Sequence, residues 1–339
     1  MKRMRLFLFS ALLVAVTFVS CGPKAPEYKK RLFVDTKPVE DLSFDRYEEV
    51  LFQLDTANFQ QELKSIQQQY KPFLDGDLDN PEAVRYLKNF AIDPFSVTLY
   101  QKVKNAFPDL DAIRSAVDGV YGHFHYYYPE IQLPTHIYTC VSGINPEVPP
   151  VLLYGDALVI SLDWYLDDDV VYEQIGMPQY RSRRTVVERL TRDIGQQLYD
   201  VYFDKEVKGN SLLDEMVNVG RMDYFIEAMC HDIADSILLG YTSSQMWWIE
   251  DNEGSLWADM VGSQYLYSTD LEVYRTFLSD GPFTNEYSHE APPRLGEYVG
   301  LQIVRSYMAY HEMTLQELMS TDDLQGLFLD SRYKPRKKS

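Results

Sequence analysis

The chain has 339 residues, 45% of them hydrophobic and 24% charged, and its formal net charge is −19 at pH 7. This composition is typical of a folded protein with a large core. The excess of negative charge argues against binding to nucleic acid and against membrane attachment through a basic patch.

Residues 1–20 have the features of a lipoprotein export signal. Three basic residues lie in the first five positions, and an apolar run over 6–19 ends just before Cys21. The run is shorter than the roughly 20 residues that span a bilayer, which argues against an ordinary membrane helix. We expect cleavage before Cys21 and its lipidation, with palmitate among the acyl chains. The mature chain would lose three positive charges and carry −22.

The remainder is expected to divide into a lipid-anchored tether, one globular body and a tail. Gly, Pro and charge without periodicity indicate the tether over 21–42. The body is expected over 43–333, with a helical N-terminal part (43–130), a small sheet (131–180) and a helical lobe (181–333). Residues 334–339 are basic and are expected to be a solvated tail.

Apolar spacing predicts helices in the N-terminal part over 44–70 and 109–121. Between them, the Asp-rich segment 75–79 resembles the start of a calcium loop. Asn80 and Tyr86 stand where that loop needs Gly and Glu, so a turn followed by a helix capped at Asn80 is predicted instead.

Two short β-branched and aromatic runs, 134–141 and 157–162, are predicted to be strands of a small antiparallel or mixed sheet. After Pro178 the pattern is helical again. Helices are predicted at about 182–203, 211–238, 243–266, 270–279 and 293–311. The fold class is therefore α+β and predominantly helical.

Two cysteines, Cys140 and Cys230, follow Cys21. In an oxidising periplasm they could form a disulfide, or they could be separate buried thiols that pack as small hydrophobic side chains. Their spacing does not distinguish these alternatives, and no Cys/His ladder predicts a metal site.

Histidines give no further sign of a metal site. His123 and His125 lie two residues apart, so on a strand both imidazoles would point the same way. No third ligand stands at motif spacing, and an aromatic, partly exposed strand or turn is the expected structure.

The predicted order of elements is that of zinc peptidases of the HExxH kind: one helix, two strands, a helix from about 182 and a later helix with a carboxylate. In those enzymes two histidines at i and i+4 bind zinc and the intervening Glu activates water. Here Arg192 and Gln196 occupy the histidine positions and Asp193 the position of the base. A guanidinium has no lone pair to give, so Arg192 cannot bind zinc. The sequence predicts a degenerate site, with an ordinary amphipathic helix as the alternative.

Glu253 lies inside the apolar stripe of its predicted helix, at the place of the downstream carboxylate. An unpaired buried carboxylate is very costly, so a buried Glu253 needs a partner. We expect Arg192 or another arginine such as Arg305 to form that ion pair. The alternative is a partly exposed Glu253 at the edge of the stripe.

The second half of the chain, from about residue 130 to 335, contains a series of short motifs at 160–166, 220–224, 240–242, 252–253 with Trp257, 266–270, 292–296, 300–308 and 331–335. In these motifs the chain resembles the gliding-motility lipoprotein GldB family of Bacteroidota. The resemblance implies a zincin-like (gluzincin-like) fold that generally lacks the metal ligands. It also implies association with the gliding machinery of the cell envelope, which shares parts with the type IX secretion system.

The resulting interpretation is a non-catalytic lipoprotein, without cofactor or metal, that binds an envelope protein of the gliding or type IX secretion machinery. It would be anchored to the inner or outer membrane through Cys21, with its body facing the periplasm. Trp247, Trp248 and Trp257 are candidate anchors for the partner, although core packing is expected for at least two of them. Alternatives are a passive structural lipoprotein and a zinc metallopeptidase that uses Glu253, Asp193 and a distant His231.

Overall fold

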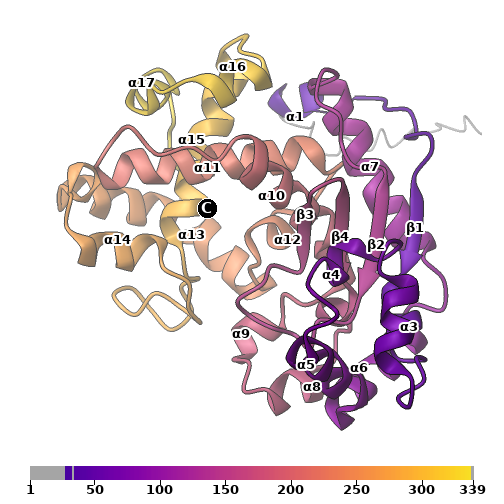
Figure 1. Ribbon diagram of the computed structural model, residues 1–339. Helices are drawn as coiled ribbons and strands as arrows, with labels where there is room; N and C mark the ends of the chain where they lie inside the picture. Colours follow the sequence, from indigo (N-terminus) through magenta and orange to yellow (C-terminus); the bar gives the residue numbers. More distant parts are fainter. Residues whose placement is uncertain (1–26, 33, 337–339) are drawn as a thin grey trace, which may run out of the picture.

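The computed structural model describes residues 27–32 and 34–336 (Figure 1). The expected signal sequence 1–20, the expected lipidation site Cys21 and the last residues of the expected tail lie outside this range. The described chain is mostly helical and contains one small sheet, as the sequence predicts. No helix within this range is both long and apolar enough to cross a membrane.

The sheet has four strands in the order β1-β2-β4-β3. They are β1 (Ser43–Arg46), β2 (His136–Cys140), β3 (Val151–Tyr154) and β4 (Ala157–Ser161). β1, β2 and β4 are parallel, and β3 pairs antiparallel with β4, so the sheet is mixed. β2 and β4 confirm the two predicted strands. β1 begins where a helix was predicted, and β3 was not predicted.

Helices cover both faces of the sheet, which explains why every residue of β4 is buried. Side chains alternate between the faces. Ile137 and Leu158 pack into the main helical cluster, whereas Tyr138 and Val159 pack into a second cluster with the N-terminal helices. Those helices are α2 (Tyr47–Leu51), α3 (Phe59–Ile66), α4 (Lys71–Leu74) and α5 (Pro81–Ile92). The buried apolar residues of the next helix, α6 (Pro94–Ala106), belong to the main cluster.

Asn80 caps α5, as predicted, because its side chain accepts a hydrogen bond from the Glu82 N–H. The predicted helix over 109–121 is α7 (Asp111–Tyr127). It is longer than predicted and includes His123 and His125, so the prediction that they lie on a strand or turn was wrong. The helix-breaking signal comes only after Tyr128, at Pro129.

The first described helix, α1 (Glu27–Leu32), corrects the predicted tether. It lies against α15 (Leu295–Tyr310), and its side chains Tyr28 and Leu32 are buried in the main cluster. These two apolar residues are four apart, which places them on one helix face. Part of the segment 21–42 therefore belongs to the folded body.

The C-terminal half consists of helices around a central, closely packed pair, α11 (Leu212–Met229) and α15 (Figure 1). The pair packs tightly where Gly220 meets Gly300. The other elements are η1 (Leu162–Tyr165), α8 (Asp169–Gln174), α9 (Gln179–Ser182), η2 (Val187–Arg189), α10 (Leu190–Tyr202), α12 (Asp235–Leu239), α13 (Ser243–Gly262), η3 (Tyr265–Tyr267), α14 (Leu271–Leu278), α16 (Leu315–Ser320) and α17 (Leu324–Asp330).

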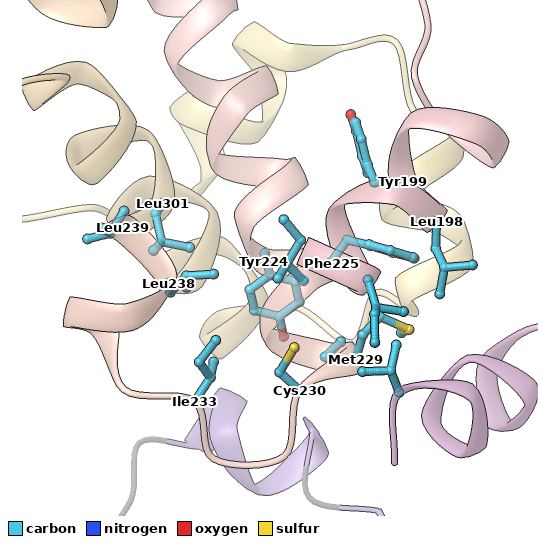
Figure 2. Close-up of a cluster of buried hydrophobic side chains, with 14 of the residues drawn as sticks. Leu198, Tyr199, Tyr224, Phe225, Met229, Cys230, Ile233, Leu238, Leu239 and Leu301 are labelled. Atoms are coloured by element: carbon cyan, nitrogen blue, oxygen red, sulfur yellow. The ribbon is translucent and has the colours of Figure 1, made fainter. Parts of the chain in front are cut away.

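Cys140 and Cys230 are separate, buried thiols, and they do not form a disulfide with each other. Cys140 lies in the cluster between the sheet and the N-terminal helices, whereas Cys230 follows α11 in the main cluster. Figure 2 shows the Cys230 sulfur among apolar side chains. Burial raises the pKa of Cys230 to about 12 and that of Cys140 well above its usual value.

We expect both thiols to resist alkylation in the folded protein, because burial suppresses the reactive thiolate. After unfolding without reductant, mass spectrometry should find an iodoacetamide label on both Cys140 and Cys230. Labels that appear only after reduction would reveal a disulfide and contradict the structure.

Candidate functional site

The predicted site positions on α10 are held by neighbouring protein groups. Leu190, Ile194 and Leu198 bury one face of this helix. On the other side, Nε of Arg192 donates to the Leu238 carbonyl at 3.4 Å, and its Nη1 lies 3.6 Å from Asp193 Oδ1. Arg192 is thus anchored to the end of α12.

Asp193 and Gln196 also have protein partners. The Tyr165 hydroxyl donates to Asp193 Oδ2 at 3.0 Å. Nε2 of Gln196 donates to Asp200 Oδ1 at 2.7 Å, one turn further along α10. The structure therefore brings Arg192 and Asp193 together and directs Gln196 to a separate contact.

Glu253 is buried, with 2% of its surface exposed, so the alternative of a partly exposed side chain was wrong. It accepts hydrogen bonds from the hydroxyls of Tyr298 at 3.1 Å and Tyr333 at 2.7 Å. Nε of Arg336 lies 3.8 Å from Glu253 Oε2. An arginine therefore lies beside Glu253, but it is neither of the two that were named, Arg192 and Arg305. The C-terminal segment folds back over α13 and supplies Arg336 instead.

The contacts of Arg336 also correct the expected tail. Its guanidinium lies 3.2 Å from Glu250 as well as near Glu253, so residues up to Arg336 belong to the body. We expect Arg336→Gln to lower the free energy of unfolding by about 1 kcal/mol, the upper range for partly exposed ion pairs. Lys334→Gln, at an exposed neighbouring position, is the matched control. Equal urea midpoints for the two variants would contradict this assignment.

Arg305 instead forms a buried ion cluster with two carboxylates. Its guanidinium makes paired hydrogen bonds of 2.9 Å to Glu227 and of 2.7 Å to Asp235. Lys29 of α1 lies 3.7 Å from Glu227. Burial raises the pKa of Glu227. Burial by itself would also raise the pKa of Asp235. There the hydrogen bonds and the charge of Arg305 outweigh burial, so the pKa of Asp235 is lowered.

A further cluster of arginines surrounds the C-terminal end of α12. Four successive carbonyl oxygens, from 237 to 240, each accept a hydrogen bond from a different guanidinium. The donors are Arg189 to Ile237 at 2.6 Å, Arg192 to Leu238 at 3.4 Å, Arg294 to Leu239 at 2.6 Å and Arg184 to Gly240 at 3.3 Å. These carbonyls are the unsatisfied, partially negative end of the helix, which cations stabilise.

Gly240 is required at this point. Its φ is +67°, and a Cβ would lie 2.8 Å from Nη1 of Arg189. Glycine adopts this left-handed conformation at the end of a helix without steric cost. The chain can therefore turn directly from α12 to α13 beneath the arginines.

Beside these arginines lies a cleft with a volume of about 560 Å³, which we call the arginine cleft. It is formed by α9, the segment after it, the end of α12, the start of α13 and the loop at 281–282. Arg183, Arg184 and Arg189 line it, together with Tyr180 and Tyr241. The cleft thus combines guanidinium groups with aromatic walls.

The cleft has more guanidinium than carboxylate groups around it. Asp193, Asp280 and Glu297 pair with arginines, and Asp223 is fully buried behind them. The arginines number six: Arg181, Arg183, Arg184, Arg189, Arg192 and Arg294. Burial and the charge of Arg192 lower the pKa of Arg189 to about 10. Burial and the nearby Glu297 raise the pKa of Asp223 well above its usual value, which weakens its compensation of the arginines.

No motif in the sequence predicted this cleft. One signal was present, since five of the six arginines fall within residues 181–192 of an acidic chain. The sixth, Arg294, comes from the distant start of α15, which only the fold brings to the same place.

The histidines remain apart from this cleft. His123 is buried on α7, and its Nδ1 lies 2.7 Å from the Gly119 carbonyl. Its ring stacks on His231 at a centroid distance of 6.0 Å. Across residues 27–32 and 34–336, no three His, Cys, Asp or Glu side chains are grouped as metal ligands would be.

Of the three candidate tryptophan anchors, Trp248 and Trp257 are partly buried against the main cluster. Trp247 is 66% exposed on α13. It follows Ser243, which lines the arginine cleft, by four residues, so the two share a helix face. An exposed tryptophan therefore lies about one turn along α13 from the cleft.

A family model described as "Gliding motility protein GldB" matches residues 29–335. The match begins within α1 and ends in the segment that covers Glu253. Neither the search of curated proteins nor the search of solved structures gave a match.

Proposed function

The chain belongs to the GldB family of gliding-motility proteins, and from this premise we propose that it is a non-catalytic envelope lipoprotein that acts by binding another protein. The partner belongs to the gliding machinery or to the type IX secretion machinery that shares parts with it. The family supports a role in gliding motility, and the binding mechanism is our proposal.

The side chains at the peptidase-like positions carry the proposal. Arg192 cannot donate a lone pair to a metal, and its guanidinium is bound to the end of α12. Asp193 is held by Tyr165 and by arginines, and Glu253 by two tyrosines and Arg336. Groups that would have to bind metal or activate water are instead bound to the protein itself.

A degenerate peptidase-like body is supported by the order of elements. The helix α7 precedes strands β2 and β4, and the helices α10 and α13 follow. The carboxylate of Glu253 lies on that later helix. This is the order from which the sequence predicted a zincin-like fold.

Lipid anchoring at Cys21 would hold the body close to the membrane. Five residues separate Cys21 from the first residue of α1. Fully extended, they reach roughly 18 Å. We propose that the body faces the periplasm from either the inner or the outer membrane, with α1 as its membrane-proximal end.

Elemental analysis of the purified full chain tests the absence of catalysis. We expect far less than one zinc per chain after mild dialysis, and no cleavage of a casein substrate. Glu253→Gln serves as the matched variant and should change neither result. Near-stoichiometric zinc that is lost in Glu253→Gln would contradict the proposal and favour an altered metallopeptidase.

A further inference from the structure

We propose that the arginine cleft binds a carboxylate-rich peptide segment of the partner protein. This inference rests on the proposed function and names the chemistry of the partner. Arg183, Arg184 and Arg189 line the cleft, and the planar guanidinium group pairs with a carboxylate through two parallel hydrogen bonds.

The lining arginines retain donors for such a ligand. Arg183 is exposed, and its side chain has no hydrogen-bond or ion-pair partner among the described residues. Arg184 uses Nε for the Gly240 carbonyl and Nη1 for Asp280. Arg189 uses Nη1 for the Ile237 carbonyl, and its Nη2 lies 4.0 Å from Asp193 Oδ1. Because a guanidinium has five N–H donors, each keeps several for a bound anion.

The start of α13 adds a second, independent set of donors. Thr242, Ser243 and Gln245 line the cleft, and α13 has 20 residues. The capping box between Thr242 and Gln245 satisfies their own backbone N–H groups. The N–H groups of Ser243 and Ser244 belong to the first turn, which has no intrahelical acceptors. An anion in the cleft would therefore also meet the positive end of the helix.

The charge around the cleft favours an anion although the whole chain is acidic. Three arginines and no Asp or Glu residue line the cleft. Asp223, behind the arginines, is fully buried, and neither of its oxygens is hydrogen-bonded among the described residues. Burial and repulsion between arginines lower the pKa of Arg189. One or two added carboxylates would offset this repulsion.

The walls favour a peptide over a free phosphate. Tyr180, Val186, Tyr241 and Pro282 provide aromatic and apolar surface that a phosphate ion would leave uncovered. The volume of about 560 Å³ lies within the range of pockets that enclose drug-sized ligands. It can hold a few residues of an acidic segment, while the exposed Trp247 offers an anchor beside it.

Fluorescence anisotropy with a synthetic peptide tests the inference. The probe is a labelled acetyl-Gly-Asp-Glu-Tyr-Asp-Glu-Gly-amide, and the full chain is used in detergent. We expect saturable binding that weakens between 50 and 300 mM salt. The matched peptide with Asn and Gln in place of Asp and Glu should bind at least tenfold more weakly.

Two arginine variants locate the site. Arg183→Ala removes an unpaired guanidinium and should weaken binding of the acidic peptide about tenfold. Arg85→Ala, which removes an exposed arginine of α5 paired with Glu82, should leave binding unchanged. Thermal unfolding of both variants should match the unmodified protein, which separates lost binding from lost folding.

Three results would overturn the inference: no binding of the acidic peptide, equal binding of the neutral peptide, or displacement of the probe by inorganic phosphate at lower concentration than by unlabelled peptide. None of them would remove the proposed function, because a partner could bind elsewhere on the body. The zinc and hydrolysis measurements would fail separately if that function were wrong.

Discussion

Replacement of Gly300 by Ala is expected to destabilise the protein by about 4 kcal/mol or more, among the largest effects of single substitutions. A Cβ at Gly300 would lie 1.8 Å from the Met216 carbonyl oxygen of α11. From the other side, a Cβ at Gly220 would lie 2.2 Å from the carbonyl carbon of Gly300. These contacts are with backbone atoms, so relief requires α11 and α15 to move apart.

Urea denaturation followed by circular dichroism measures this effect. Gly262→Ala is the matched control, since Gly262 also lies in a helix and nothing surrounds its Cβ position within 4 Å. Alanine is favoured over glycine inside helices, so the control should gain up to about 1 kcal/mol. A Gly300→Ala variant within about 1 kcal/mol of the unmodified protein would disprove the tight crossing of α11 and α15.

Replacement of Arg305 by Met is expected to destabilise the protein by about 3–5 kcal/mol, because it leaves buried carboxylates without their counter-charge. Glu227 and Asp235 both lose paired hydrogen bonds. Arg275→Ala, on an exposed arginine of α14 paired with Glu272, is the control and should cost less than about 1 kcal/mol.

The loss of stability that Arg305→Met causes should grow as the pH rises. Without the guanidinium, burial raises the folded-state pKa of Glu227 and Asp235 above their unfolded values. The folded variant then binds more protons than its unfolded chain. The free energy of unfolding of the variant is therefore higher at low pH and falls as the pH rises. Denaturation at pH 5 and pH 8 should show the larger loss at pH 8. A smaller loss at pH 8 would contradict the buried pairing.

Local sequence patterns predicted the elements that carry their own signal. The helices α5, α10, α11, α13 and α15 follow apolar periodicity, and the buried runs of β2 and β4 are rich in β-branched residues. β1 was predicted as helix because pairing with β2 decides its conformation. The short helix α1 was missed because its stability comes from packing Tyr28 and Leu32 on distant helices.

In the candidate site, too, the contacts between distant segments could not be predicted from local sequence patterns. The apolar stripe of α13 correctly indicated that Glu253 could be buried, but its partners Tyr298, Tyr333 and Arg336 come from α15 and the C-terminal segment. No local pattern encodes such contacts. The arginine cleft likewise needs the end of α12 to meet Arg294 from the start of α15.

The central claim is that this protein acts by binding and not by hydrolysis. The most direct test uses strains of the source organism in which the only copy of the gene carries one of two changes. Gliding of these strains is measured, or protein export if the organism does not glide. The double variant Asp193→Asn with Glu253→Gln removes the peptidase-like carboxylates, and Arg183→Glu reverses charge in the arginine cleft. At equal protein abundance, the account predicts normal movement or export for the carboxylate variant and loss for Arg183→Glu. Loss in the carboxylate variant with normal behaviour of Arg183→Glu would contradict it.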